Sequence, residues 1–297
     1  MLNEDESFLL CRTGNSHRPT LESRVAYQFE IDGNNVGFYS GSMKNRITLE
    51  WLRDIIHQSD SKERRVLDIG CAYGNMMLML NALLCKDQSI EFYGVDLHDE
   101  GVAYGATFAR TVAGYENCHY SVQDLSVGLN FADGFFTAIY IGDVLEHMDD
   151  PGATLEELKR MLSPGGVIIV STPILDSLFK RIAGFANMFS GGKLFKEYYK
   201  GKNTQLDANG NPVMITPVGN DHVSELPAKE LFKLFASRNL EVIKFKSMSV
   251  NSGSLWFDRH LFLMSFVFFI EAIHERLQIH NWGHSVMVML KPQNKGF

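Results

Sequence analysis

Between residues 65 and 173 the chain alternates short apolar runs with stretches in which apolar residues recur at helical spacing. The apolar runs are predicted strands, at 65–70, 89–97, 118–125, 135–143 and 167–173. The segments between them are predicted helices at 75–85, 101–113 and 149–162, with a turn at 163–166. Strands separated by helices are typical of a parallel sheet, so we predict a Rossmann-like α/β fold with helices on both faces.

The flanking segments complete this predicted architecture. Residues 45–58 carry apolar side chains at the spacing of a helix that packs on the sheet. Towards the end of the chain, the pattern predicts a helix at 226–239 and strands at 240–248 and 284–291. These two strands bring the sheet to seven. A long helix rich in aromatic residues is expected at about 255–277.

Composition places the chain among ordinary globular proteins. Hydrophobic residues make up 45% of its 297 residues and charged residues 21%. The four cysteines lack the spacing of a metal site or a disulfide framework, which fits a reducing compartment. The acidic start of the chain is unlike a secretory signal, and the most apolar run, 261–270, is about half of a bilayer span. We therefore expect a cytoplasmic protein.

Charge is distributed unevenly along the chain. Residues 1–173 contain 13 Lys or Arg and 25 Asp or Glu, a net charge of −12, whereas residues 174–297 contain 15 and 10, a net charge of +5. The contrast has two interpretations, a chance distribution of solvated charge or a second part that faces an anionic substrate or surface. The overall net charge of −7 does not favour a nucleic acid as partner.

The stretch RVLDIGCAYGN places an acid and two glycines at the end of the first predicted strand. A dinucleotide-binding loop receives its pyrophosphate on the pattern G-x-G-x-x-G, which this stretch lacks. Asp68, two residues before Gly70, suits a ligand with a positively charged amino group. Asp96, at the end of the second strand, can accept hydrogen bonds from both hydroxyls of a ribose. S-adenosylmethionine carries both groups and no phosphate, so we predict it as the cofactor, with S-adenosylhomocysteine as its product.

Five segments in order, VLDIGCAYG, GVDL, QDL, GDVLEHMDDP and LKRMLSPGGVIIVSTP, resemble the motifs of class I S-adenosylmethionine-dependent methyltransferases. The pattern is most similar to the branch that contains ubiquinone-biosynthesis-type O-methyltransferases. The resemblance covers roughly residues 45–173 and implies the seven-stranded class I methyltransferase sheet. Ala72 departs from the family, which usually has glycine there, so its effect on cofactor binding stays open.

The resemblance also implies where the cofactor lies. At its methionine end we expect Asp68, Gly70, Cys71 and Gly74, with Arg46 as a partner for the carboxylate. At its ribose and adenine we expect Asp96, Leu97, Asp124 and Leu125, and beneath it Gly142.

Asp143, Glu146 and His147 follow the fourth predicted strand, where ligands of open α/β sheets bind. In one interpretation His147 is a general base that accepts a proton from an acceptor hydroxyl. In a second, these three residues hold a divalent metal together with His222, because the pattern resembles the metal motif of small-RNA 2′-O-methyltransferases. In a third, Glu146 and His147 only stabilise the loop. His147 and His222 are therefore the candidate catalytic histidines.

The remaining segments are expected to select the acceptor. We divide the chain into an N-terminal cap (1–44), a cofactor-binding core (45–173), a basic and aromatic lid insertion (174–224) and a C-terminal completion of the core (225–297). The insertion suits an ordinary lid helix, a membrane surface or an anionic acceptor. The helix at 255–277 is apolar on most faces, so we expect it to be buried against the domain or a second subunit, with lipid contact as the alternative.

Together these features predict a methyltransferase that modifies an oxygen atom of a small-molecule acceptor such as a phenol, a sugar or a secondary metabolite. The alternatives are a metal-dependent RNA 2′-O-methyltransferase and a non-catalytic protein that keeps the fold for assembly with a partner. A homodimer and peripheral contact with a membrane or a lipid-linked substrate are further hypotheses.

Overall fold

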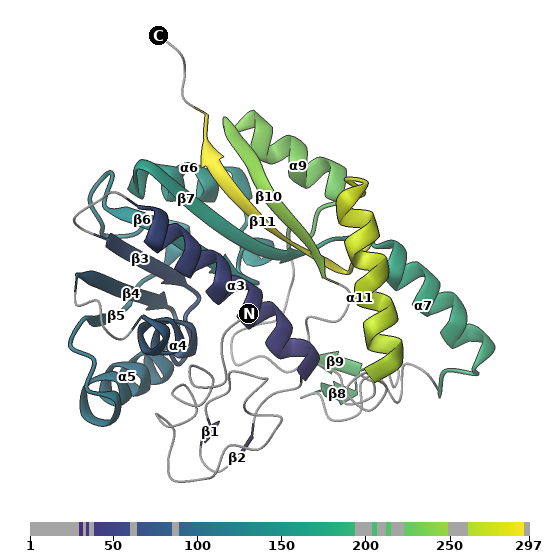
Figure 1. Cartoon of the computed structure of the whole chain (residues 1–297), viewed down its shortest axis with the longest axis horizontal. Coiled ribbons are helices and arrows are strands. Elements are labelled where there is room, and N and C mark those ends of the chain that lie inside the picture. The colour runs from purple at the N-terminus through teal and green to yellow at the C-terminus, as the bar shows by residue number, and fades with distance from the viewer. Residues whose placement is uncertain are drawn as a thin grey trace.

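The computed structural model describes residues 30–31, 34–35, 39–59, 64–84, 89–193, 204–206, 212–214, 223–248 and 261–293. In this part of the chain seven strands form one sheet in the order β10-β11-β7-β6-β3-β4-β5 (Figure 1). They are β3 (Arg64–Ile69), β4 (Ile90–Asp96), β5 (Cys118–Val122), β6 (Phe136–Gly142), β7 (Leu162–Pro173), β10 (Leu240–Met248) and β11 (Ser285–Pro292). Strands β3 to β7 run parallel, and β11 lies antiparallel between β7 and β10. The predicted seven-stranded α/β fold is confirmed.

The helices connect and flank these strands. They are α3 (Tyr39–Gln58), α4 (Asn75–Leu83), α5 (Asp99–Phe108), α6 (Pro151–Met161), α7 (Leu178–Phe189), α9 (Ala228–Ser237) and α11 (Leu261–Arg276). Three short helical turns are η1 (Ala109–Ala113), η2 (Leu125–Val127) and η3 (Leu145–His147). Two small ladders pair β1 (Glu30–Ile31) with β2 (Asn34–Asn35), and β8 (Thr204–Leu206) with β9 (Pro212–Met214). Among the described helices, none has the length and hydropathy needed to cross a membrane.

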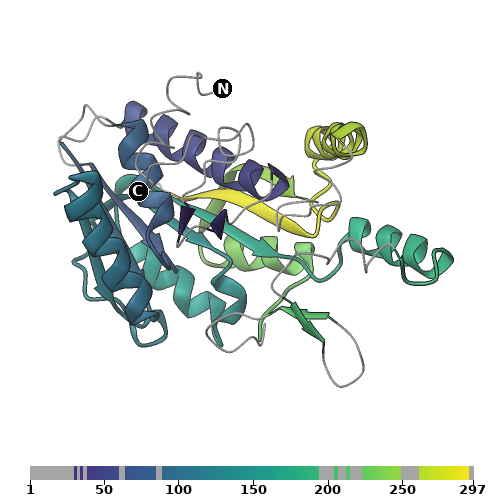
Figure 2. The ribbon, with the colours of Figure 1, turned by 90° about the horizontal axis from the view of Figure 1, so that it is seen from below.

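Helices cover both faces of the sheet (Figures 1 and 2). On one face, α3 and α4 pack over a cluster that includes Val66 of β3. On the other, α6 and α9 pack over a cluster that includes Leu67 of the same strand. Successive side chains of a strand point to opposite faces, and here both faces are buried. The core strands therefore appear in the sequence as continuous apolar runs.

Three elements differ from the sequence-based expectation. Helix α3 begins at Tyr39, six residues before the expected start, and so includes Lys44. The turn expected at 163–166 lies within β7 as a bulge, since Phe136 pairs with Leu162 and Ala138 already pairs with Val167. The described part of the aromatic helix, α11, is buried on one face only, at Val267 and Glu271, and its phenylalanine-rich face is exposed. Residues 255–260 of that predicted helix lie outside the described residues.

Candidate cofactor site and active site

The carboxyl ends of β3, β4 and β6 lie at one edge of the sheet, because these strands are parallel neighbours. Most candidate residues follow these ends. We call residues 70–74, after β3, the glycine loop, and residues 142–147, after β6, the β6-exit loop. The end of β4 supplies Asp96 and Leu97. The fold therefore brings together residues that are far apart in the sequence.

The glycine loop contains three residues with a left-handed backbone, Gly70 (φ +75°), Ala72 (φ +47°) and Gly74 (φ +74°). A Cβ atom at Gly70 would lie 2.3 Å from Cγ2 of Val144, and one at Gly74 would lie 2.2 Å from Cε1 of Tyr120. Both distances are far below van der Waals contact. The two glycines are thus required by sterics as well as by backbone conformation.

Asp96 ties the glycine loop to the end of β4. Its carboxylate accepts hydrogen bonds from the backbone N–H of Ala72 (2.7 Å) and of His98 (2.8 Å). A carboxylate has about four acceptor positions. Two of them therefore stay open to the hydroxyls of a ribose while the other two fix the loop.

Two glycines of α5, which the sequence analysis did not single out, bring that helix against the glycine loop. A Cβ atom at Gly101 would lie 3.0 Å from the carbonyl oxygen of Ala72, and one at Gly105 would lie 2.8 Å from that of Tyr73. Residues four apart share one face of a helix, so the spacing of Gly101 and Gly105 in the sequence could have predicted that this face packs closely against a neighbouring backbone.

Asp68 is almost fully buried next to the glycine loop, with 3% of its surface exposed. Burial, and after it the negative charge of Asp96, raise the pKa of Asp68 to about 8. A neighbouring cation would lower this pKa and favour the charged carboxylate. The surroundings of Asp68 therefore favour a ligand with a positive charge. Burial also raises the pKa of the Cys71 thiol, so this side chain stays neutral and contributes packing.

The residues expected at the adenine lie beside Asp96, because Asp96 pairs with Val122 at the end of the neighbouring strand β5. Leu97 is exposed and Leu125 is buried. The Asp124 carboxylate caps η2 by accepting hydrogen bonds from the backbone N–H (2.8 Å) and the hydroxyl (2.7 Å) of Ser126. Asp124 thus fixes the local turn, and its contact with adenine stays a prediction.

The β6-exit loop begins with two backbone constraints. A Cβ atom at Gly142 would lie 2.2 Å from the hydroxyl oxygen of Tyr140. Asp143 has a left-handed backbone (φ +55°), which is uncommon for a residue other than glycine. Its backbone N–H donates to the carbonyl of Ser171 (2.8 Å), and its carboxylate forms an ion pair with Lys44 of α3. The loop is therefore held on both sides.

Lys44 is a site residue that the sequence analysis missed. It is only 7% exposed. Burial alone would lower the pKa of Lys44, but the negative charge of Asp143, followed by Tyr140, outweighs burial and raises the pKa above its ordinary value. Lys44 therefore stays charged and anchors the β6-exit loop to α3. Arg46, the expected carboxylate partner, belongs to the same helix, but its side chain lies outside the described residues.

Glu146 and His147 differ in accessibility. Glu146 is buried, and its carboxylate accepts a hydrogen bond from the hydroxyl of Thr172 (2.9 Å). The backbone carbonyl of Glu146 accepts the N–H of Ser224 (3.0 Å), which joins the loop to the segment before α9. His147 is half-buried at the end of η3. Glu146 thus stabilises the loop, and His147 is the more accessible of the two side chains.

The described residues contain no group of three His, Cys, Asp or Glu side chains arranged to hold a metal ion. Of the proposed ligands, Asp143 is paired with Lys44 and Glu146 is bonded to Thr172. His222 lies outside the described residues. The geometry of Asp143, Glu146 and His147 therefore does not support the metal interpretation.

A family model described as a methyltransferase domain matches residues 43–244, more than half of the chain. The chain belongs to this methyltransferase family. The methyltransferase is of the class I, S-adenosylmethionine-dependent type, which confirms the resemblance found in the sequence.

Curated relatives include methyltransferases with different acceptors. The demethylmenaquinone methyltransferase of Lysinibacillus sphaericus is 23% identical over 247 residues, 80% of this chain and 95% of the relative. The norajmaline N-methyltransferase of Rauvolfia serpentina is 28% identical over 50% of this chain and 53% of the relative. The ubiquinone/menaquinone biosynthesis C-methyltransferase UbiE of Vibrio campbellii is 30% identical over 53% of this chain and 61% of the relative. The chain thus spans less than two thirds of the last two.

Solved structures agree with the fold. The [4+2]-cyclase SpnF is 17% identical, with a TM-score of 0.51 over 89% of this chain and 85% of that chain. The geranyl diphosphate C-methyltransferase of Streptomyces coelicolor, solved with Mg²⁺, geranyl diphosphate and S-adenosyl-L-homocysteine, is 16% identical, with a TM-score of 0.50 over 86% of this chain and 84% of that chain. At these identities the likeness establishes the fold alone.

The site of this methyltransferase fits S-adenosylmethionine. The glycine loop offers backbone surface from which side chains are excluded at Gly70 and Gly74. Asp96 keeps acceptor positions for a ribose, and the surroundings of Asp68 favour a positively charged amino group. Phosphate would meet two carboxylates here, so a dinucleotide is disfavoured.

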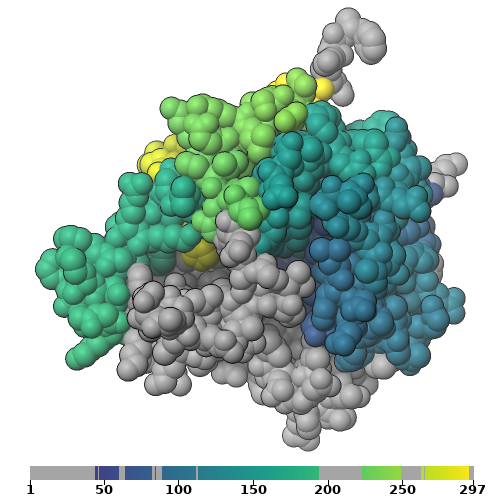
Figure 3. Space-filling model, turned by 180° about the vertical axis from the view of Figure 1, so that it is seen from behind, coloured from purple at the N-terminus to yellow at the C-terminus, as the bar shows by residue number. Residues whose placement is uncertain are grey.

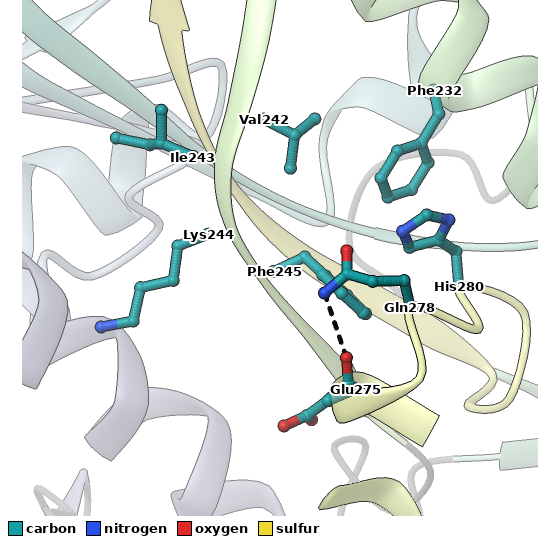
Figure 4. Close-up of a pocket in the computed structure, with 8 residues that line it drawn as sticks. All are labelled: Phe232, Val242, Ile243, Lys244, Phe245, Glu275, Gln278 and His280. Carbon is teal, nitrogen blue, oxygen red and sulfur yellow. Dashed lines mark hydrogen bonds between the residues drawn. The ribbon is translucent and has the colours of Figure 1, made fainter. Parts of the chain in front are cut away.

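A separate cavity of about 430 Å³ lies at the edge strand β10 (Figure 4). It is lined by Phe232, Val242, Ile243, Lys244, Phe245, Glu275, Gln278 and His280. His280 stacks on Phe232 with ring centroids 4.0 Å apart, and the Glu275 carboxylate is bonded to Lys246 and to the backbone of Ser247. The cavity is four strands from β3 in the sheet, so it belongs to neither the cofactor site nor the β6-exit loop.

Replacing Ala72 with glycine is expected to stabilise the methyltransferase. A left-handed backbone strains alanine, and glycine removes this strain while gaining freedom in the unfolded chain. We expect the free energy of unfolding to rise by about 0.5 kcal/mol, because the relief of backbone strain in the folded state exceeds the cost of the larger conformational entropy that glycine has in the unfolded chain. Urea denaturation measures it, with Ala103→Gly at an exposed position in the middle of α5 as the control that should destabilise. A less stable Ala72→Gly variant would show that alanine at this position is not strained.

Proposed function

We propose that this methyltransferase methylates an oxygen atom of a small-molecule acceptor, preferably a phenol, and that His147 accepts the proton of the acceptor hydroxyl. The observation that carries the proposal is the contact between the β6-exit loop and the glycine loop. The side chain of Val144 fills the space beside Gly70, so the two loops are in contact. His147 follows three residues later in the same loop.

When bound, S-adenosylmethionine supplies a methyl group on a positively charged sulfur and leaves as S-adenosylhomocysteine. In the proposed reaction, His147 takes the hydroxyl proton as the acceptor oxygen forms its bond to the methyl carbon. Glu146, buried and bonded to Thr172, keeps η3 in place. Lys44 and Asp143 fix the start of the loop. These contacts support a fixed position for the imidazole ring, which efficient proton transfer requires.

Replacing His147 with alanine is expected to lower kcat by about 100-fold, the usual contribution of a general base. The affinity for S-adenosylhomocysteine should stay within threefold, because the cofactor contacts are made by other residues. Transfer of a radiolabelled methyl group to a panel of phenols measures turnover. His57→Ala, at the exposed end of α3, is the matched control and should retain full activity.

Full turnover by His147→Ala would disprove the proposed role of this residue as a base, but the assignment of the cofactor site would be unaffected. A loss of turnover on addition of a chelator would favour the metal-dependent alternative. If no phenol is methylated, the acceptor class is wrong, and the panel is extended to sugars and other hydroxyl compounds.

Methylation of a ring carbon is the second candidate. The demethylmenaquinone methyltransferase of L. sphaericus, whose name refers to a quinone acceptor, is matched along 95% of its length. A base that removes a hydroxyl proton from a hydroquinone also increases electron density on the ring carbons, so the same histidine serves either outcome. NMR of the product distinguishes the two, since an O-methyl and a ring methyl have different carbon shifts.

A further inference from the structure

Helix α11 presents a continuous apolar face to solvent. Its exposed large side chains recur every three or four residues and so lie on one face of the helix: Phe262, Phe266, Phe269 and Ile273, continued by Leu277. Their surfaces are between 38% and 89% exposed. Val267 and Glu271, on the opposite face, are buried. The helix therefore packs on the methyltransferase through one face and exposes a phenylalanine-rich face along its whole length.

Helix α7 is exposed in a similar way. None of its residues is buried, although the helix is strongly amphipathic. Four large apolar side chains, Ile182, Phe185, Met188 and Phe189, are between 58% and 74% exposed. The helix projects from the body of the molecule (Figure 3), and α7 and α11 lie at the same end, away from α4 and α5 (Figures 1 and 2). We call the exposed faces of α7 and α11 the two-helix surface.

The exposed charges of the two-helix surface are positive. Lys180, Arg181 and Lys193 are exposed on α7 and directly after it, and residues 178–193 contain no Asp or Glu. In α11 Arg276 is exposed. The two acidic residues of α11 are turned away from solvent or neutralised: Glu271 is buried, and Glu275 accepts from Lys246 (3.0 Å) and from the backbone of Ser247 (3.0 Å). Both helices thus combine an apolar face with cations.

We propose that the two-helix surface docks the methyltransferase on an anionic lipid membrane, with α7 and α11 lying in the interface. Apolar side chains of an interfacial helix enter the boundary between headgroups and acyl chains, and basic residues are attracted by anionic headgroups. A second copy of the chain fits this surface less well, because its cations would face cations of the same kind. The inference concerns where the methyltransferase acts and does not depend on the acceptor.

Co-sedimentation of the full chain with vesicles tests this inference. We expect binding to vesicles of equal parts phosphatidylglycerol and phosphatidylcholine, much weaker binding to phosphatidylcholine alone, and release by high salt. Lys180→Gln with Arg181→Gln should weaken binding to the anionic vesicles by about 30-fold, at about 1 kcal/mol for each charge. Phe262→Ser with Phe269→Ser, and separately Phe185→Ser with Phe189→Ser, should each weaken it by at least about tenfold.

Val127→Ser is the matched control, because Val127 is also an exposed apolar residue (82%) but lies in η2, outside the two-helix surface. It should bind vesicles as the unchanged chain does. All variants should bind S-adenosylhomocysteine normally, which verifies that they are folded. No binding to anionic vesicles, or equal binding by all variants, would overturn the inference. So would sedimentation as a dimer that the phenylalanine variants convert to the monomer of 33.6 kDa, since the surface would then join two copies.

Discussion

Replacing Asp96 with alanine is expected to weaken the binding of S-adenosylhomocysteine by about 300-fold. The carboxylate accepts the N–H groups of Ala72 and His98 and has acceptor positions left for a ribose. Hydrogen bonds to a charged group contribute about 1.5–3 kcal/mol each, and two lost ribose contacts correspond to this factor. Loss of the bond to Ala72 also frees the glycine loop, which adds to the effect. Calorimetric titration measures the change in Kd.

Two further variants make this result specific. Asp96→Asn keeps one acceptor oxygen and the shape of the side chain, so an intermediate loss is expected. Asp99→Ala is the matched control, because Asp99 is an exposed acid three residues away whose carboxylate accepts the neighbouring N–H of Glu100 (2.8 Å). It should bind within twofold of the unchanged chain. Binding by Asp96→Ala within threefold would mean that the ribose is held elsewhere.

The core of the fold could be predicted because its signals are local. Strands buried on both faces are largely apolar, so β6 and the buried part of β7 appear in the sequence as nearly continuous apolar runs. The glycine loop could be predicted for a similar reason. Close contacts with Val144 and Tyr120 exclude every side chain at Gly70 and Gly74, and this requirement leaves a readable pattern. Asp96 could be placed because a strand end fixes its position.

Lys44 could not be predicted because its role depends on a partner 99 residues away. In the sequence it lies at the end of the N-terminal cap, one residue before the predicted helix, and lysines in such positions are usually solvated. Glu146 shows the reverse case. The acid-x-x-Glu-His pattern allowed Glu146 to be interpreted as a metal ligand, but in the fold its carboxylate is buried and accepts a hydrogen bond from Thr172. Which neighbours a polar side chain meets depends on tertiary packing, which a local pattern does not contain.

The exposure of α11 was missed for the same reason. A helix that is apolar on most faces is normally buried, and hydrophobicity alone does not say whether the covering surface belongs to the same chain. The sequence therefore left the domain, a second subunit and lipid as alternatives. Because the phenylalanine-rich face of α11 is exposed, the domain does not cover this face of the described helix. Vesicle binding decides between the other two.

Removing the Asp143 carboxylate is expected to destabilise the methyltransferase by about 3 kcal/mol. Asp143→Ala leaves the cation of Lys44 buried without its partner, and it places alanine in a left-handed backbone. Breaking a buried ion pair costs about 3–5 kcal/mol, and the lower value applies because the Asp143 side chain is half-exposed and solvent can partly replace it. Urea denaturation monitored by circular dichroism measures the free energy of unfolding.

The double variant Lys44→Met with Asp143→Ala shows whether the unpaired charge causes this loss. Without the buried cation, we expect the double variant to recover about 2 kcal/mol relative to Asp143→Ala, leaving mainly the backbone strain. Asp143→Gly separates the strain, because glycine accepts the left-handed backbone while Lys44 stays unpaired. If the double variant is less stable than either single variant, Lys44 contributes through its packing in α3. The ion pair would then not be what holds the β6-exit loop beside the glycine loop.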